Sequence, residues 1–568
     1  LKRFDDAAWQ QAASSCVDHA YMIRQLLPPD RIHNYAHNEE WLVRTYNELG
    51  RAKDALALAR SLVAVPRYPD LNTLDKANTS ASYGRTRLIE TLVKWELWSE
   101  LRRLSATPWL SAADAPPAHQ VTLQRALASA AFAEKDAAAL RRAIAELEKL
   151  QPKAKTTAET KSKVGKAAEL TPPAPATETR KALPANAAAK AAQKTAQAAK
   201  SDAPPAAPPQ TKPSAPAPKK DLAAAPAPDA TKKLTPAPDT SAKPKAEPKK
   251  KKPEPAVVAL QEARALLQVL EKKPDAAEAL LAAEYLDATE RVRALLHLGR
   301  KEDAVKQIEK LPQDLLGQII RAHTAWQGGD RALAESAFKK AHDLAYAMDT
   351  DLPAARRLFQ LAYKLKHGGK WRADPPVRDD LGERPAFDRL GPLHWHPPTA
   401  PMLKLEPVSD SPPDLHAAQP RLLLFYLGAG CSHCVEQLDA FAKTAEAWKK
   451  AGITVHAAAP GTQAEVTQTW DVVESGKNLP FPIWRDPTGE TFKAWRAWDD
   501  FEKMPLHATI LLDAENRVRW LDISWQPFMD AAFLLKEAQR LLSLDEVDQF
   551  TALPTSDDAK QVVSSANR

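Results

Sequence analysis

Hydrophobic and polar positions follow two different patterns along this chain. In the first part, apolar residues recur at helical spacing, as in Leu42, Tyr46 and Leu49. From about residue 398 the period changes, and the apolar runs at 421–427, 453–459 and 508–513 have the length of buried strands. Apolar positions between 435 and 448, ended by a glycine at 452, predict a helix between the first two runs, and 528–542 predicts a closing helix. The pattern therefore predicts a helical region followed by alternating strands and helices.

A glycine followed by apolar residues at the same two distances recurs in the helical part. The sets are Gly50, Ala55 and Ala59; Gly299, Ala304 and Ile308; and Gly329, Ala334 and Phe338. A glycine at a turn, with an alanine five positions later and an apolar residue nine positions later, allows two antiparallel helices to approach closely. This spacing resembles the tetratricopeptide repeat, whose helical hairpins stack into a solenoid. Helical hairpins of no repeat family are the alternative. The helical part contains no catalytic constellation, so we expect it to serve as a scaffold or to bind a protein partner.

Residues 151–255 differ in composition from the rest of the chain. They contain 20 of the 48 prolines, with 21 Lys or Arg against 9 Asp or Glu. Such a segment buries too little apolar surface to offset the entropy of ordering, so we predict a disordered Ala/Pro/Lys-rich linker. Its basic charge exceeds the net charge of +7 of the whole chain. The segment also lacks aromatic residues that stack on bases, so we expect no specific nucleic-acid binding.

The length of 568 residues requires several domains. The chain has no apolar run of about 18 residues, so we expect no transmembrane segment. Its 3 cysteines exclude a disulfide-stapled scaffold. The predicted fold class is multidomain, with an all-α repeat region and a C-terminal α/β thioredoxin-like sandwich. The expected parts are helical repeats at 1–150, the linker at 151–255, helical repeats at 256–370, a connecting loop at 371–397, the thioredoxin-like domain at 398–547 and a flexible tail at 548–568.

The candidate reactive residues lie in the segment "FYLGAGCSHCVEQ", which places Cys431 and Cys434 at a predicted helix start. The unpaired amides of the first helical turn stabilise a thiolate on Cys431, and the spacing allows a reversible disulfide. A protonated His433 would favour that thiolate further. A structural zinc site needs four ligands, and no second cysteine pair exists. We therefore favour redox chemistry over a metal site or an inert pair, and expect no cofactor.

The C-terminal part resembles the alkyl hydroperoxide reductase/thiol-specific antioxidant branch of the thioredoxin superfamily, the redoxins. The resemblance rests on "APMLKLEPVSD" at 400–410, which is similar to the opening strand, and on "LPFPIWRDPTGETFKAWRAW" at 479–498. It rests also on "HATILLDAENRVRW" at 507–520, which is similar to the penultimate hairpin. The family implies a thioredoxin-like sandwich with a thiol as the reactive group.

The family's peroxidases carry Pro-x-x-x-Thr-x-x-Cys, in which the cysteine attacks peroxide. Aligned on Cys434, this chain has Leu427 at the proline position and Cys431 at the threonine position. The family's arginine corresponds to His507, which the resemblance implies as a proton donor or thiolate stabiliser. Pro505 lies two residues before the position where related disulfide reductases have a cis-proline. Both peroxidase helpers are replaced, which favours dithiol–disulfide exchange.

The leading hypothesis is a thiol–disulfide oxidoreductase with Cys431 as nucleophile and Cys434 as resolving thiol. Its partners would be a protein dithiol or disulfide substrate and an electron-donor thiol protein. The alternatives are a peroxiredoxin-like antioxidant peroxidase with Cys434 as peroxidatic cysteine, and a non-enzymatic repeat scaffold with a redoxin-fold binding domain. A fourth alternative is copper delivery with the cysteines and a distal histidine as ligands, which the resemblance disfavours because copper-carrying redoxins space their cysteines by one more residue. A redoxin with a long Lys/Ala/Pro linker favours a bacterial cell envelope or periplasmic location over the cytoplasm.

Limited proteolysis tests the linker prediction. Because 151–255 is expected to lack a packed core, a protease of broad specificity should cut there first and release a stable C-terminal fragment. Mass spectrometry of the early products locates the first cuts. First cuts elsewhere, with 151–255 intact, would contradict the prediction.

Overall fold

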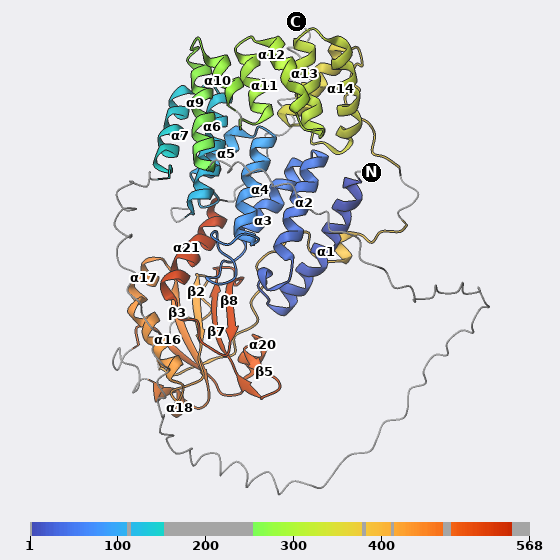
Figure 1. Ribbon diagram of the computed structural model, residues 1–568. Coiled ribbons are helices and arrows are strands. Elements are labelled where there is room, and N and C mark those ends of the chain that lie inside the picture. The colour runs from blue at the N-terminus through green and yellow to red at the C-terminus, as the bar shows by residue number, and fades with distance from the viewer. Residues whose placement is uncertain are drawn as a thin grey trace, which may run out of the picture. The chain divides into compact units, whose positions relative to one another are not determined.

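The computed structural model describes residues 3–110, 115–152, 254–283, 285–377, 382–409, 414–469 and 479–547 (Figure 1). The predicted linker lies almost entirely outside the described residues, as does the predicted tail. The described residues on both sides of the linker belong to one compact unit. Within this unit a helical region precedes a mixed α/β domain, which confirms the predicted fold class for these parts.

The helical region consists of antiparallel helices consistent with helical repeats (Figure 1). Before the linker these are α1 (Phe4–Gln25), α2 (Tyr35–Leu49), α3 (Ala52–Ala64), α4 (Ser80–Lys94), α5 (Trp98–Ser105), α6 (Pro117–Ala133) and α7 (Ala137–Lys149), with a 3₁₀ turn at Pro29–Arg31. After it come α9 (Pro255–Leu270), α10 (Ala276–Ala282), α11 (Ala288–His297), α12 (Lys301–Gln307), α13 (Leu315–Gln327), α14 (Arg331–Leu344) and α15 (Pro353–Lys364), with 3₁₀ turns at Ile308–Lys310, Ala345–Ala347 and Phe387–Arg389.

The recurring glycines lie at the turns that the sequence predicts. Gly50 ends α2 with φ of 76°, a left-handed conformation that costs glycine little. Ala55 and Ala59 of the next helix are fully buried. Gly299 and Gly329 also have positive φ, and each lies two residues before the first residue of the next helix. The spacing thus encodes close helical hairpins, while membership of the tetratricopeptide family stays a prediction.

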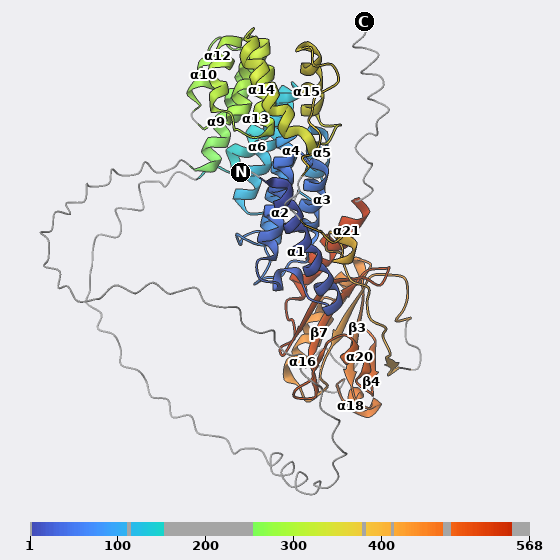
Figure 2. The ribbon, with the colours of Figure 1, turned by 90° about the vertical axis from the view of Figure 1, so that its right-hand side faces the viewer.

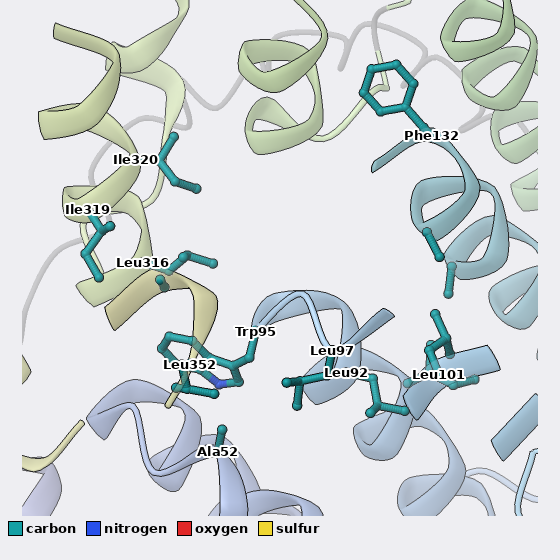
Figure 3. Close-up of a cluster of buried hydrophobic side chains, with 14 of the residues drawn as sticks. Ala52, Leu92, Trp95, Leu97, Leu101, Phe132, Leu316, Ile319, Ile320 and Leu352 are labelled. Carbon is teal, nitrogen blue, oxygen red and sulfur yellow. The ribbon is translucent and has the colours of Figure 1, made fainter. Parts of the chain in front are cut away.

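The helices before and after the linker share one hydrophobic core. Helices α7 and α9 pack against each other, and the Gln151 side chain donates to the Ala256 carbonyl oxygen at 3.0 Å. Figure 3 shows Leu92 and Trp95 near α4 in the same buried cluster as Leu316 of α13. The linker therefore connects two neighbouring helices of one packed array.

The α/β domain contains a six-stranded sheet in the order β1-β4-β3-β2-β7-β8 (Figure 2). Strands β2, β3 and β4 are parallel, whereas β7 runs antiparallel to β2 and to β8, and β1 runs antiparallel to β4. The strands are β1 (Glu406–Pro407), β2 (Arg421–Phe425), β3 (Thr454–Pro460), β4 (Ile483–Asp486), β7 (His507–Leu512) and β8 (Val518–Ser524), and a separate hairpin pairs β5 (Trp498–Asp499) with β6 (Met504–Pro505). The helices are α16 (Ser432–Lys443), α17 (Ala445–Lys450), α18 (Gln463–Thr467), α20 (Glu490–Ala494) and α21 (Ala531–Val547).

Both faces of the sheet are covered. Figure 1 shows α16 and α20 on opposite sides of the strands. Leu422 and Leu424 of β2 join the core beneath α16 and α21, while Leu423 and Phe425 join the core on the other face. Because successive residues of a strand point to opposite faces, a continuous apolar run fits a strand buried on both sides.

Two local predictions need correction. The helix expected as one piece up to the glycine at 452 is two helices, because it breaks at Thr444. The Thr444 hydroxyl donates to the Phe441 carbonyl oxygen at 3.0 Å and accepts from the Trp448 indole at 3.2 Å, which offers the backbone an alternative to a continuous helix. The opening strand expected within 400–410 is reduced to Glu406–Pro407.

The helical region contacts the α/β domain through the segment after α3. Tyr68 stacks on Trp520 of β8 with ring centroids 5.0 Å apart. The Arg540 guanidinium of α21 donates to the carbonyl oxygens of Val63 and Val65 at 2.9 and 3.0 Å. These groups satisfy carbonyls that the end of a helix leaves without partners. The edge strand β8 is thereby covered by the same chain.

None of the helices in the described part of the chain has the length and hydrophobicity needed to cross a membrane.

Glu39 of α2 is a buried carboxyl group in the helical region. Its side chain is 1% exposed, and its Oε1 lies 4.0 Å from Nε2 of His19. Burial raises the pKa of Glu39 to about 7, with a smaller contribution from Asp18. The folded state therefore binds this proton more tightly than the unfolded chain, so stability falls as the pH rises from about 4.5 to about 7.

Glu39→Gln should therefore stabilise the protein at pH 8 and change little at pH 5. The upper limit of the gain is about 3 kcal/mol, from about 1.4 kcal/mol per pKa unit. Urea unfolding at both pH values measures this difference, with the exposed Glu146→Gln as control. An equal effect at pH 5 and pH 8 would show that Glu39 is not the titrating group.

Candidate active site

The cysteine pair lies where the chain leaves β2 and enters α16. Cys431 is the N-cap residue of α16, and its Sγ accepts the backbone N–H of Cys434 at 3.3 Å. The preceding loop turns at Gly428, whose φ of 106° lies in the region that favours glycine. Cys431 is half-buried, so its sulfur is accessible from one side. This arrangement places the first thiol at the positive end of the helix dipole.

Cys434 lies one turn further along α16 and is fully buried. Its Sγ accepts the backbone N–H of Leu427 at 3.3 Å. Burial, together with the neighbouring Cys431 thiol, raises the pKa of Cys434 well above the usual range of a thiol. The two thiols are therefore unequal, because the second is held neutral and out of solvent. Both are free thiols.

His507 is the first residue of β7 and faces both sulfurs. Its Nε2 lies 3.6 Å from Sγ of Cys431 and 3.2 Å from Sγ of Cys434. Burial lowers the pKa of His507, and backbone groups of Trp525 and Ser524 partly offset this effect. A lowered pKa favours the neutral imidazole at neutral pH. The ring is thus positioned to exchange a proton with either thiol.

The structure pairs His433 with a carboxylate on its own helix. Its side chain is 67% exposed, and its Nδ1 lies 3.4 Å from the Glu436 carboxylate. Its recorded partner is thus a carboxylate rather than a thiol. A role of His433 in favouring the Cys431 thiolate therefore stays a prediction without a supporting contact.

Two supporting groups were not anticipated from the sequence. One is the backbone N–H of Leu427, which donates to Sγ of Cys434. The sequence could not indicate this role, because almost any residue at that position would supply the same backbone donor. The other is Gln437, a fully buried side chain whose Nε2 donates to Thr509 Oγ1 and to the Phe528 carbonyl oxygen, each at 3.0 Å. Gln437 thereby ties α16 to β7, which carries His507. The sequence signal that could have identified Gln437 is a polar residue on the buried face of the predicted helix, three positions after Cys434.

Pro505, two residues before the position considered for a cis-proline, lies in β6, and the described residues contain no cis peptide bond. Among the described His, Cys, Asp and Glu side chains, Cys431, Cys434 and His507 form the single group of three whose ligand atoms come together, within 4.8 Å of one another.

The thioredoxin-like sheet, with a dithiol at a helix start beside β7, defines the C-terminal part as a redoxin-type thiol domain. Residues 400–521 match the AhpC/TSA family, so this part of the chain is an AhpC/TSA domain. The family match places the domain in the thiol peroxidase and oxidoreductase class without separating the two activities.

Solved structures similar to this chain include Enterococcus faecalis AhpC, with 14% identity over 24% of this chain and 83% of that one, at a TM-score of 0.22. Plasmodium vivax 2-Cys peroxiredoxin has 18% identity over 26% and 97%, at a TM-score of 0.24. Peroxidoxin BcpB from Mycobacterium tuberculosis has 17% identity over 26% and 96%, at a TM-score of 0.23. No curated protein matches the chain.

Alkylation of the reduced protein should distinguish the two thiols. Because Cys434 is fully buried with a raised pKa, iodoacetamide at pH 7 should label the half-buried Cys431 first. Peptide mass spectrometry over a time course measures the order, with the buried Cys16 as an internal control. Labelling of Cys434 ahead of Cys431 would contradict the inequality of the thiols.

Proposed function

We propose that the AhpC/TSA domain is a thiol–disulfide oxidoreductase that uses Cys431 as the nucleophile and Cys434 as the resolving thiol. The observation that carries the proposal is the inequality of the pair. Cys431 is accessible and accepts a backbone N–H, whereas Cys434 is buried between the Leu427 N–H and His507. A first thiol open to a partner and a second thiol shielded from it suit two successive steps.

In the first step, the Cys431 thiolate attacks one sulfur of a substrate disulfide. The substrate S–S bond breaks, and its other sulfur leaves as a thiolate that takes a proton from solvent. A mixed disulfide then joins Cys431 to the substrate. The Cys434 N–H, which donates to Sγ of Cys431, stabilises the thiolate before the attack.

In the second step, Cys434 attacks Sγ of Cys431. The Cys434 thiol passes its proton to Nε2 of His507, which lies 3.2 Å away. The mixed disulfide breaks, the substrate sulfur leaves as a thiolate that takes up the proton from His507, and a Cys431–Cys434 disulfide forms. The dithiol has then given two electrons to the substrate. An electron-donor thiol protein returns the pair to the reduced state by the reverse exchange.

A peroxiredoxin-like peroxidase is the second candidate, and the AhpC/TSA match favours it. In that case Cys434 would attack peroxide, because it occupies the family's peroxidatic position. Two features weigh against it. Cys434 is fully buried with its pKa raised, and the threonine and arginine positions carry Cys431 and His507. The third alternative, a scaffold without enzymatic activity, does not account for the contact of His507 with both thiols.

We propose further that the helical region binds the protein partner. A cavity of about 580 Å³ lies among α4, α6, α9, α11 and α13. Its lining combines apolar side chains such as Ile89 and Leu266 with charged ones such as Glu262 and Arg293. A cavity lined by both apolar and charged side chains is suited to bind a partner segment that presents a polar group next to an apolar surface.

Trapping of mixed disulfides tests the assignment of the two thiols. Cys434→Ser should accumulate an adduct with a protein disulfide, because the attacking thiol remains and the resolving thiol is lost. Cys431→Ser should accumulate none and should lose exchange activity. Scrambled ribonuclease A, which is oxidised with mispaired disulfides, supplies the substrate disulfides, and non-reducing electrophoresis followed by mass spectrometry measures the adduct.

His507→Asn provides a third arm in the same experiment. It keeps both thiols but removes the acceptor of the Cys434 proton, so the adduct on Cys431 should still form but should resolve more slowly than in the unaltered protein. The exposed His416→Asn is the matched control. The reversed pattern, with Cys431→Ser accumulating the adduct on Cys434, would make Cys434 the nucleophile and favour the peroxidase order of roles.

A further inference from the structure

Three potential metal ligands converge at the start of α16. The Sγ atoms of Cys431 and Cys434 and a ring nitrogen of His507 all lie within 4.8 Å of one another. The sequence alone disfavoured a zinc site because it offers one cysteine pair. Pairing of β7 with β2 supplies the third ligand from 73 residues further along the chain.

The separations of the His507 ring nitrogen from the two sulfurs match those around a bound metal ion. Zinc binds cysteine sulfur at about 2.3 Å and histidine nitrogen at about 2.0 Å, so two such ligands on a tetrahedral ion lie about 3.5 Å apart. The Nε2 of His507 lies 3.6 Å from Sγ of Cys431 and 3.2 Å from Sγ of Cys434. Small side-chain movements would therefore complete the site.

We propose that reduced Cys431 and Cys434, together with His507, bind one thiophilic d¹⁰ metal ion, either Zn(II) or Cu(I). Two thiolates and one imidazole form a soft donor set. Cu(I) would be satisfied by three ligands, whereas Zn(II) would take a fourth from solvent on the accessible side of Cys431. On binding, the two thiol protons go to solvent, no electron is transferred, and the ion keeps its oxidation state.

The surrounding backbone supports this donor set. The N–H groups of Leu427 and Cys434 donate to the sulfurs of Cys434 and Cys431, respectively, at 3.3 Å. Such outer hydrogen bonds hold ligands in place and tune their donor strength. Because the metal and a disulfide use the same sulfurs, a bound ion blocks thiol exchange until it is removed. The metal proposal does not depend on which thiol attacks first.

Metal titration of the reduced, chelator-treated full chain tests the proposal. One arm adds Zn(II) in competition with a chromophoric chelator, and an anaerobic arm adds Cu(I) in competition with bicinchoninate. We expect one ion per chain in at least one arm, and the arm with binding identifies the ion. Cys431→Ser, Cys434→Ser and His507→Ala should each weaken binding at least about tenfold. The exposed His416→Asn should bind as the unaltered chain does.

A second readout avoids reliance on variants that fold poorly. In the unaltered chain, the bound ion should protect both site thiols from iodoacetamide, and a chelator should restore labelling. Absence of stoichiometric binding in both arms, or unchanged affinity in a folded His507→Ala variant, would overturn the proposal. Exchange activity is assayed separately in the metal-free protein, so a failed exchange reaction and a failed metal site are distinguishable.

Discussion

The antiparallel pairing of β2 with β7 is the constraint on which the site depends. Phe425 and Ala508 are partners in this ladder, so the loop that leaves β2 and the first residue of β7 meet at one edge of the sheet. Cys431 follows β2 on that loop, and His507 begins β7. A one-residue slip in the register would turn His507 to the opposite face, because strand side chains alternate. The buried apolar residues of both strands therefore fix the chemistry as well as the fold.

Packing around this ladder makes the two thiols different. The helix start gives Cys431 a backbone donor and leaves one side open, whereas the core beneath α16 encloses Cys434. Gln437 ties the same helix to β7, which keeps the distance from His507 to the sulfurs short. The same three side chains thus suit proton transfer during exchange and coordination of a soft metal ion. In either role the dithiol must be reduced.

Much of this architecture could be predicted from sequence because its signals are local. The glycine turns at Gly50, Gly299 and Gly329, the buried strand β2 and the helix start at Cys431 each follow from residues close in sequence. Non-local features could not be predicted in this way. The simultaneous contact of His507 with both sulfurs requires the β2–β7 register, and the sharing of one core across the linker requires the packing of α7 on α9.

One local error arose where a single polar side chain decided the course of the backbone. Thr444 breaks a helix that apolar spacing continues, because its hydroxyl bonds to the preceding turn. His433 lies beside Cys431 in sequence, yet its side chain points to Glu436 rather than to a sulfur. Closeness in sequence to the cysteines therefore does not imply contact with a sulfur. His507, which is far from them in sequence, contacts both sulfurs.

The most direct test of the account compares two oxidants on the metal-free, reduced full chain. Stopped-flow fluorescence or absorbance would follow oxidation by hydrogen peroxide and by 5,5′-dithiobis(2-nitrobenzoate), with Cys431→Ser and Cys434→Ser as matched variants. The account predicts rapid reaction with the disulfide through Cys431, and reaction with peroxide no faster than that of free cysteine. Peroxide oxidation orders of magnitude faster than free cysteine, and abolished by Cys434→Ser, would contradict it and establish a peroxidase.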